Sequence, residues 1–245
     1  MRGRDGVPAP RAGWAYFFDV DGTLAEFAPT PAEVRLDAGV LVGLRRLHER
    51  SGGAVALVSG RSIADVDSIF HSPLPVAGQH GLERRDARGV LYRREPSPGA
   101  LDAARVRLAE VVARHAGLLL EDKGLTLALH YRRAPALAAF SHRTMRAIQR
   151  ELGSAYATQP GKCVVELKPA SMDKGVAVTD FLREAPFMGR IAVFVGDDAT
   201  DEHGFAVVNA LGGHTIKVGG GPTTARWRLA SVAAVSAWMA ELSKA

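Results

Sequence analysis

Uncharged apolar runs alternate along this chain with segments in which apolar residues recur at helical spacing. The runs at residues 14–18, 54–58 and 191–195 are typical of strands that are buried on both faces of a parallel sheet. Apolar positions three or four apart, as in residues 37–47 and 63–70, predict amphipathic helices that cover such a sheet. Because strands and helices alternate, the pattern predicts an α/β fold with parallel strands.

The pattern changes in the middle of the chain, within residues 97–170. One helix is predicted at about residues 101–115 and another at about 136–152, and each is followed by two short strands. Helix, strand and strand twice over, with short turns, predict a small antiparallel sheet with two helices on one face. The predicted division is a parallel-sheet core of residues 1–96 and 171–245 and an inserted α+β cap of residues 97–170, with a linker at Pro96, Pro98 and Gly99.

Carboxylates follow two of the buried strands at the point where each strand ends. Asp19 and Asp21 come after the first strand, and their charges repel unless a cation lies between them. Asp197 opens an acidic cluster after the strand at 191–195, and the carboxyl ends of parallel strands form the edge at which α/β sheets bind ligands. Mg²⁺ prefers oxygen ligands and leaves positions for water and phosphate, so the pattern predicts magnesium-dependent phosphate chemistry. For the first pair alone, an acidic turn that caps the next helix is the alternative.

Residues 19–23 (DVDGT) resemble the first motif of the haloacid dehalogenase-like (HAD) phosphohydrolases. Later in the chain, three residues match the other motifs of that family in the same order: Ser59, Lys174 and Asp197. The resemblance implies a HAD-like Rossmannoid core. It also implies that Asp19 attacks phosphorus to give an aspartyl-phosphate, while Asp21 is the general acid and then the base.

The same resemblance assigns roles to residues around the two aspartates. Ser59 would bind the phosphoryl group that is transferred, and Lys174 would offset its negative charge. The remaining implied roles are Mg²⁺ ligation by Asp19, by the backbone carbonyl of Asp21 and by Asp197, substrate contacts from Thr23 and Arg61, and orientation of metal-bound water by Asp198 and Asp201.

Further stretches resemble the trehalose-6-phosphate phosphatases, a family of HAD-like enzymes, and the likeness extends from about Phe17 to the last helix. The stretches are GQHGLE (78–83), EDKG (121–124), HYR (130–132), GKCVVELKP (161–169) and GDDATDE (196–202). The resemblance implies Mg²⁺-dependent hydrolysis of trehalose 6-phosphate, with sugar hydroxyls bound by a cap that closes over the core. Carboxylates beside a lysine donor suit a polar disaccharide. The implied sugar-binding residues are Glu121, Lys123, His130 and Glu166.

Composition and charge exclude several classes of protein. With 47% hydrophobic and 23% charged residues, the chain is typical of a globular protein. The formal net charge of +5 comes from basic residues that are interleaved with acids and lack stacking aromatics, so we expect no nucleic-acid partner. No apolar run is long enough to span a membrane and residues 1–13 are too polar for a secretory signal, which predicts a cytoplasmic protein without a membrane partner. The one cysteine, Cys163, is expected to be buried rather than reactive, and a monomer is favoured.

Three other functions compete with this interpretation. A HAD phosphatase for another sugar phosphate, such as sucrose 6-phosphate, would combine the same core with a different cap. A receiver-like signalling domain also presents an acidic cluster that accepts phosphate, but receivers are shorter and lack an insert. A catalytically silent sugar-phosphate-binding protein would not need the catalytic residues, all of which are present.

Overall fold

The computed structural model describes residues 6–28, 33–94 and 99–244. The chain divides into two compact units, and each has an apolar core of its own. The core unit comprises Met1–Tyr92 and Asp173–Ala245, and the cap unit comprises Arg93–Met172.

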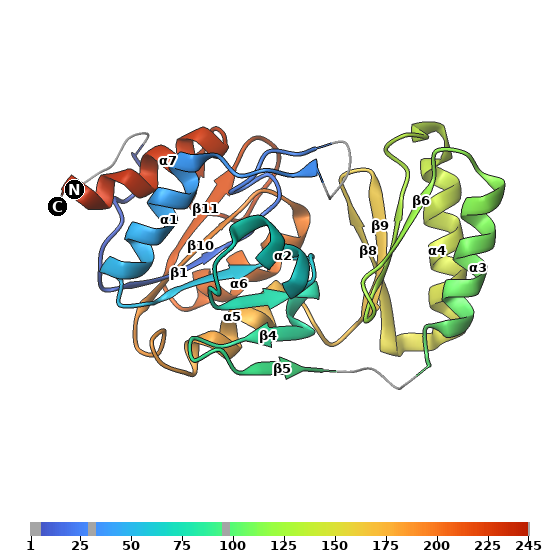
Figure 1. The fold of residues 1–245 in the computed structure, drawn as a ribbon, viewed down its shortest axis with the longest axis horizontal. Helices are drawn as coiled ribbons and strands as arrows, with labels where there is room; N and C mark the ends of the chain where they lie inside the picture. The colour runs from blue at the N-terminus through green and yellow to red at the C-terminus, as the bar shows by residue number, and fades with distance from the viewer. Residues whose placement is uncertain (1–5, 29–32, 95–98, 245) are drawn as a thin grey trace. The chain divides into compact units, whose positions relative to one another are not determined.

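The core unit alternates strands and helices along both of its segments (Figure 1). Its strands are β1 (Trp14–Phe18), β2 (Val55–Val58), β3 (Val76–Gly78), β4 (Glu83–Arg85), β5 (Leu91–Arg93), β10 (Ile191–Gly196), β11 (His214–Val218) and β12 (Trp227–Leu229). Its helices are α1 (Ala38–Arg50), α2 (Ile63–Phe70), α5 (Lys174–Leu182), α6 (Glu202–Ala210) and α7 (Val232–Ala240), with short 3₁₀ segments at Gln79–Gly81, Ala199–Asp201 and Glu241–Lys244.

These strands form one mixed sheet in the order β12-β11-β10-β1-β2-β3-β4-β5. Neighbouring strands from β12 to β3 are parallel, whereas β4 runs antiparallel to β3. Helices α1, α2 and α7 contribute to the apolar cluster on one face, and α5 and α6 contribute to the cluster on the other. The sheet is therefore covered on both sides, as the uncharged strands predicted.

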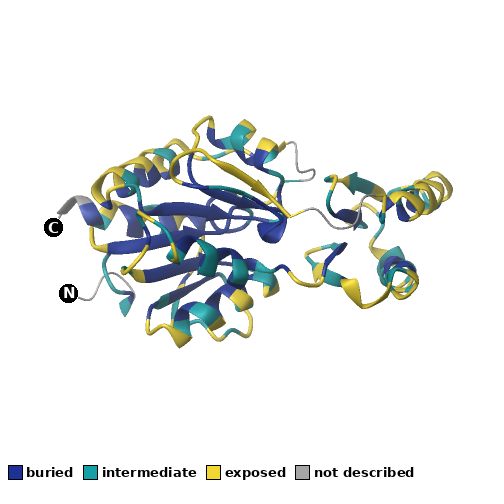
Figure 2. Ribbon diagram, turned by 90° about the horizontal axis from the view of Figure 1, so that it is seen from below, coloured by how far each residue is buried: buried dark blue, intermediate teal, exposed yellow. Residues whose placement is uncertain are grey.

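Alternation of side chains along β1 explains how one strand serves both clusters. Tyr16 and Phe18 belong to the cluster with α1, α2 and α7, while Ala15 and Phe17 belong to the cluster with α5 and α6. All four residues have no exposed surface, and Figure 2 shows the central strands as the most deeply buried part of this unit. A charge at any of these positions would be buried without a partner.

Strands β1 and β10 lie side by side where the direction of strand addition reverses. From β1 the chain adds β2 and β3 on one side, and from β10 it adds β11 and β12 on the other. The carboxyl ends of β1 and β10 thus meet at a topological switch point, the position at which open α/β sheets bind ligands. Asp19 follows β1 and Asp197 follows β10, so the fold brings both carboxylates to this edge.

The cap unit is a second, antiparallel sheet with two helices on one face (Figure 1). Its elements are α3 (Asp102–Arg114), β6 (Leu119–Asp122), β7 (Leu127–His130), α4 (Ala138–Leu152), β8 (Tyr156–Gly161) and β9 (Val164–Pro169), with 3₁₀ turns at Pro135–Leu137 and Gly153–Ala155, in the strand order β6-β7-β9-β8. Leu129 and its apolar neighbours in register pack against the helices. Glu121, Ala128, Glu166 and Gln159 pair in a row across the sheet, so they share the opposite face.

The predicted fold class, an α/β core with an inserted α+β unit, is confirmed. Pro96 and Pro98 of the predicted linker lie outside the described residues. The prediction that Cys163 is buried is wrong. This residue lies in the turn between β8 and β9, where it is half-buried and has a positive φ of 63°. Pro160 and Gly161 mark this hairpin turn in the sequence, but the apolar residues that follow Cys163 suggested that Cys163 belongs to the buried strand.

Candidate active site

Asp19 and Asp197 extend two adjacent strands of the core unit. The backbone N–H of Asp19 donates to the carbonyl of Val195 at 2.9 Å, which continues the β1–β10 pairing to the point where both carboxylates leave the sheet. A Cβ added to Gly22 would overlap the carboxylate of Asp197, and the φ of 82° at Gly22 also favours glycine. The turn after β1 is therefore held directly against Asp197.

Lys174 is the cation of this carboxylate cluster. It is the first residue of α5, whose start is capped by the side chain of Asp173, and its own side chain is only 2% exposed. Its Nζ donates to Oδ1 of Asp19 and to Oδ1 of Asp201, each at 2.7 Å. Burial disfavours a charged lysine, but the carboxylates of Asp19 and Asp201 outweigh it and raise the pKa of Lys174, so the side chain is an ammonium ion.

Asp201 lies behind the acidic loop and orders it. Its Oδ2 accepts hydrogen bonds from the backbone N–H groups of Asp197 and Asp198, both at 2.9 Å. Asp198 in turn accepts from the backbone of Ala199 at 2.6 Å and so caps the short helix that follows. Both residues thus shape the loop that carries Asp197. Their part in orienting metal-bound water stays a prediction.

The donor set fits a divalent cation. One oxygen from each of Asp19, Asp197 and Asp201 lies within 4.8 Å of the others, and all three residues are buried. Lys174 supplies one positive charge against these three carboxylates. Burial raises the pKa of Asp19 well above its usual value, Lys174 opposes this, and the charges of Asp201 and Asp197 raise it further. A bound Mg²⁺ would offset the excess negative charge with the oxygen ligands that it prefers.

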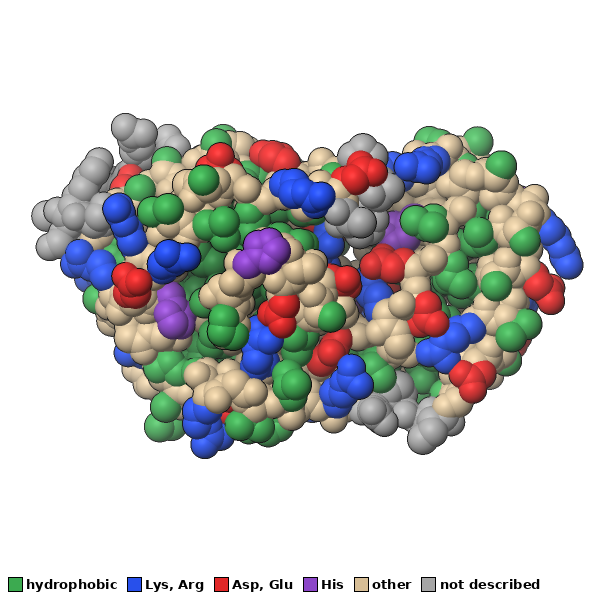
Figure 3. Space-filling model, viewed as in Figure 1, with side chains coloured by type: hydrophobic (Ala, Val, Ile, Leu, Met, Phe, Trp, Pro, Cys, Tyr) green, Lys and Arg blue, Asp and Glu red, His purple; other side chains and the backbone are tan. Residues whose placement is uncertain are grey.

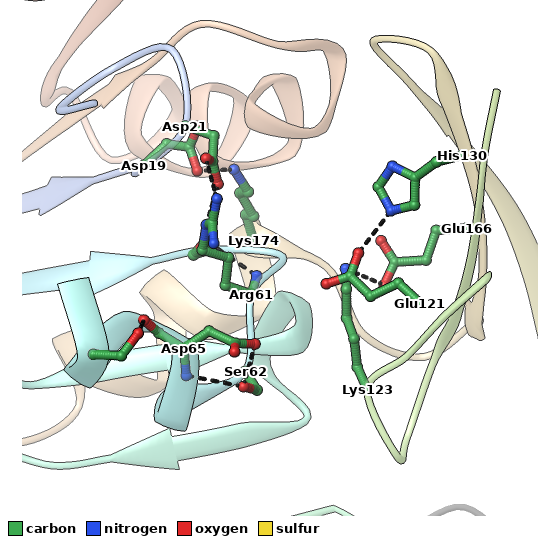
Figure 4. Close-up of polar contacts among 12 residues, drawn as sticks. Asp19, Asp21, Arg61, Ser62, Asp65, Glu121, Lys123, His130, Glu166 and Lys174 are labelled. Atoms are coloured by element: carbon green, nitrogen blue, oxygen red, sulfur yellow. Dashed lines mark hydrogen bonds and ion pairs between the residues drawn. The ribbon is translucent and has the colours of Figure 1, made fainter. Parts of the chain in front are cut away.

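Arg61 binds Asp21 through two hydrogen bonds (Figure 4). Nε donates to Oδ2 and one terminal nitrogen donates to Oδ1, each at 2.7 Å. The backbone N–H of Arg61 also donates to Oγ of Ser59 at 3.1 Å. Ser59 follows β2 at the same sheet edge. Oγ1 of Thr23 is buried, and no hydrogen-bond partner for it lies among the described residues. The sequence assigned Arg61 to the substrate, and its partner in the structure is Asp21.

The polar face of the cap unit gathers the predicted sugar-binding residues. Oε1 of Glu166 accepts from Oγ1 of Thr126 at 2.6 Å and from Nζ of Lys123 at 3.2 Å. Both charged side chains are about nine-tenths buried, so this ion pair is better shielded from solvent than a surface pair. The carboxylate of Glu166 is therefore held in one orientation by a hydroxyl and a cation.

A second pair lies on the same face. Nε2 of His130 is 2.7 Å from Oε2 of Glu121, as Figure 4 shows beside the pair of Lys123 and Glu166. Burial opposes ionisation of Glu121, but the hydrogen bond from His130 and the positive charges of Lys123 and His130 lower the pKa of Glu121 below its ordinary value. The structure thus brings together all four residues that the sequence assigned to the sugar. Their binding of the sugar stays a prediction.

Sequence reasoning assigned no role to three residues that support these groups. Thr126 holds Glu166, Gln79 belongs to a turn beside Ser59, and Lys217 on β11 donates from its buried Nζ to the backbone carbonyl of Asp197. A signal existed for Lys217, because a lysine between two apolar residues of a strand needs a nearby acceptor. Thr126 shares a period of two with Ala128 and His130, which places it on their face, but the sequence does not show that this face adjoins Glu166.

These features define a HAD-like hydrolase core: aspartates at the carboxyl ends of two neighbouring strands, a serine after a third strand and a buried lysine at the start of a helix. A solved structure of a haloacid dehalogenase-like hydrolase from B. subtilis aligns with a TM-score of 0.65 over 93% of this chain and 99% of that chain. At 15% sequence identity, this likeness concerns the fold alone.

The chain belongs to the trehalose-phosphatase family. The model of that family matches residues 17–233. A trehalose-6-phosphate phosphatase of Escherichia coli (strain K12) is 45% identical over 98% of this chain and 90% of its own length. A solved structure described as a trehalose-6-phosphate phosphatase related protein shares 26% identity, with a TM-score of 0.78 over 94% of this chain and 98% of that chain.

Proposed function

We propose that this protein hydrolyses trehalose 6-phosphate to trehalose and inorganic phosphate. The observation that carries the proposal is the hydrogen bond from Lys174 to Asp19 at the topological switch point of the sheet. The chain that holds this pair belongs to the trehalose-phosphatase family. The relative from E. coli is described as a phosphatase for this substrate. A carboxylate that is buried beside an ammonium ion is suited to covalent attack on an anionic phosphate.

The first step transfers the phosphoryl group to the protein. A carboxylate oxygen of Asp19 forms a bond to phosphorus, the bond from phosphorus to the sugar O6 breaks, and Asp21 gives a proton to the departing oxygen. Lys174 and Ser59 bind the phosphoryl oxygens and keep the group in line with Asp19. The products of this step are trehalose and an aspartyl-phosphate at Asp19.

The second step returns the protein to its starting state. A water molecule attacks phosphorus and gives a proton to Asp21, and the bond from phosphorus to the oxygen of Asp19 breaks. Asp19, the backbone carbonyl of Asp21 and Asp197 would hold Mg²⁺, which supplies charge stabilisation for the phosphoryl oxygens when it is bound. Asp201 and Asp198 order the loop that presents Asp197.

The cap unit is the proposed source of selectivity for the sugar. Glu121 and Glu166 offer carboxylate oxygens that can accept from sugar hydroxyls, and Lys123 can donate to them. Each carboxylate is already oriented by a neighbour, His130 for Glu121 and Thr126 for Glu166. Preorganised acceptors lose less freedom when the ligand binds, which favours a disaccharide with paired hydroxyls.

The partner predicted from the sequence is this small anionic substrate. Lys and Arg side chains are interspersed with Asp and Glu side chains on the face shown in Figure 3, which gives no support to a nucleic-acid partner. Over residues 6–28, 33–94 and 99–244, no helix combines the length and apolarity needed to cross a membrane. A monomer in the cytoplasm stays a prediction.

Phosphate release from a panel of sugar phosphates tests the proposal. The panel contains trehalose 6-phosphate, sucrose 6-phosphate and glucose 6-phosphate, each with and without Mg²⁺. We expect kcat/KM for trehalose 6-phosphate to exceed the others by about 100-fold or more, because buried polar groups reject ligands that leave them unpaired. A preference for sucrose 6-phosphate, or no release from any member of the panel, would contradict the proposal.

A further inference from the structure

Two successive buried residues of the core unit adopt a backbone conformation that a Cβ disfavours. Gln79 has a φ of 46° and His80 a φ of 59°, and the two residues are 1% and 5% exposed. Of the described residues with a positive φ, fourteen are glycines and only four are not. Glycine adopts this conformation without strain, as Gly81 does next to this pair. Contacts made by residues 79 and 80 must therefore offset the strain of this backbone conformation.

The side chain of Gln79 closes the turn. Its Nε2 donates to Oε1 of Glu83, a buried residue at the start of β4. Glu83 is paired in register with Gly78, the last residue of β3, so the bond spans the turn that connects the two strands. Gln79 therefore acts as a brace that ties the left-handed turn to the sheet.

The braced turn lies against the loop that carries two residues of the site. The backbone N–H of Gln79 donates to the carbonyl of Arg61 at 2.7 Å, and the backbone N–H of His80 donates to the carbonyl of Ser59 at 3.0 Å. Gly78 approaches the same loop so closely that a Cβ there would lie 2.9 Å from the carbonyl oxygen of Arg61. The left-handed turn aims both N–H groups at this loop, and thereby fixes where Ser59 and Arg61 stand.

The contacts continue from this loop to the reacting groups. Oγ of Ser59 accepts from the backbone of Arg61, and the guanidinium of Arg61 holds both oxygens of Asp21. We propose that Gln79 is a positioning residue for the phosphatase reaction: its bond to Glu83 holds the turn that sets Ser59 and Arg61 relative to Asp21. This inference rests on the proposed function. Gln79 itself acts through the loop and not by contact with the substrate.

The first readout is activity. Gln79→Met keeps the length of the side chain but removes the donor to Glu83. We expect a folded protein with a Tm within about 5 °C of the wild type and a kcat at least about tenfold lower, because small displacements of reacting groups cost large factors in rate. The loss should be the same for trehalose 6-phosphate and for 4-nitrophenyl phosphate, since the displaced groups act on the phosphate and not on the sugar.

A matched control separates positioning from general effects of a left-handed residue. His71 also has a positive φ, of 49°, but it is exposed at the end of α2. His71→Gly should leave kcat unchanged on both substrates. If Gln79→Met does not fold, Gln79→Gly replaces it with the same expectations, because glycine keeps the positive φ and also lacks the donor.

The second readout does not depend on activity. In the Gln79→Met variant, the backbone amides of residues 79 and 80 should exchange hydrogen at least about tenfold faster than in the wild type. Exchange at the amides of β1 should be the same in both proteins. A kcat within twofold of the wild type, or exchange at both amides unchanged by the substitution, would overturn the inference. If the wild type releases no phosphate, the proposed function fails, and hydrogen exchange still decides whether Gln79 holds the loop.

Discussion

Arg61 donates hydrogen bonds from two of its nitrogens to the two carboxylate oxygens of Asp21, each at 2.7 Å. Both oxygens of Asp21 thus accept from Arg61, and a general acid must also present a proton to the leaving group from one of them. If Asp21 is the general acid, we expect it to turn one oxygen toward the leaving group when the substrate binds. A phosphate group is a natural competitor for a guanidinium, so we expect the substrate to loosen the pair.

Arg61→Lys tests this pairing. Lysine keeps the charge but cannot present two donors in a plane, and a hydrogen bond to a charged group contributes roughly 1.5–3 kcal/mol. We therefore expect kcat/KM to fall about 10- to 100-fold on trehalose 6-phosphate and on a small aryl phosphate. Arg85 is the control, because it binds both oxygens of Asp67 on α2 at 2.7 Å and has no proposed part in the reaction. Equal kcat/KM values for Arg61→Lys and Arg85→Lys would count against the role of Arg61.

Glu166→Ala tests whether the polar face of the cap unit recognises the sugar. Without the carboxylate that Thr126 and Lys123 orient, kcat/KM for trehalose 6-phosphate should fall at least about tenfold, since each hydrogen bond to a charged group contributes roughly 1.5–3 kcal/mol. The rate on 4-nitrophenyl phosphate should change less than twofold, because that substrate has no sugar. Glu151→Ala, which removes an exposed carboxylate of α4, should change neither rate. Parallel losses on both substrates for Glu166→Ala would show that Glu166 supports folding or chemistry instead.

The pH dependence of stability tests the pair of Glu121 and His130. The pKa of Glu121 is lowered by folding, so its carboxylate contributes stability above its ordinary pKa of 4.5, and this contribution disappears as the pH falls through the lower folded value. Glu121→Gln should therefore reduce the free energy of unfolding by about 1 kcal/mol at pH 7 and progressively less below about pH 4.5. Urea unfolding of both proteins across this range measures the difference.

The control for this measurement is Glu110→Gln. Glu110 forms a long, exposed pair with Arg114 on α3, with 3.5 Å between the nitrogen and the oxygen. Such pairs contribute little, so the difference from the wild type should be near zero at every pH. A difference for Glu121→Gln that does not shrink in acid would contradict the assigned pKa direction.

Removal of the metal tests the carboxylate cluster. A chelator should abolish phosphate release, Mg²⁺ should restore it, and Ca²⁺ should not, because the larger ion with looser coordination misplaces the phosphoryl group. Mg²⁺ should also raise the Tm of the wild type, since a ligand of the folded state stabilises it. Asp197→Asn should lose most of that rise in Tm. Full activity in excess chelator would exclude a metal at this cluster.

The sequence was sufficient for the parts of the fold and site that depend on local pattern. The uncharged strand at Trp14–Phe18 and the carboxylates after it identified both the central strand and the sheet edge. The roles of Thr126 and Gln79 could not be found in this way, because Thr126 acts through a partner that is distant in the chain and Gln79 through a turn geometry. The same holds for the hydrogen bonds between Arg61 and Asp21, forty positions apart. For Lys217 the strand pattern indicated a nearby acceptor but not that the acceptor is the backbone of Asp197.

The left-handed residues illustrate why local pattern fails. Cys163 begins a run of apolar residues, yet it occupies a turn and has a positive φ. Glycine and asparagine are the residues that usually adopt this conformation. Gln79 and His80 likewise contradict their intrinsic preference, and tertiary contacts hold them there. Departures from local preference of this kind concentrate at functional sites, where the surrounding structure overrides the single residue.

The assignment of Asp19 as the nucleophile that attacks trehalose 6-phosphate is open to a single assay. Phosphate release from trehalose 6-phosphate in the presence of Mg²⁺ is measured for the wild type and for Asp19→Asn, with a thermal melt to show that both are folded. Asparagine keeps the shape of the side chain but removes the attacking charge, so the wild type should release phosphate and the variant should be slower by about 1,000-fold or more. A folded Asp19→Asn variant with a rate within about tenfold of the wild type would show that Asp19 is not the nucleophile.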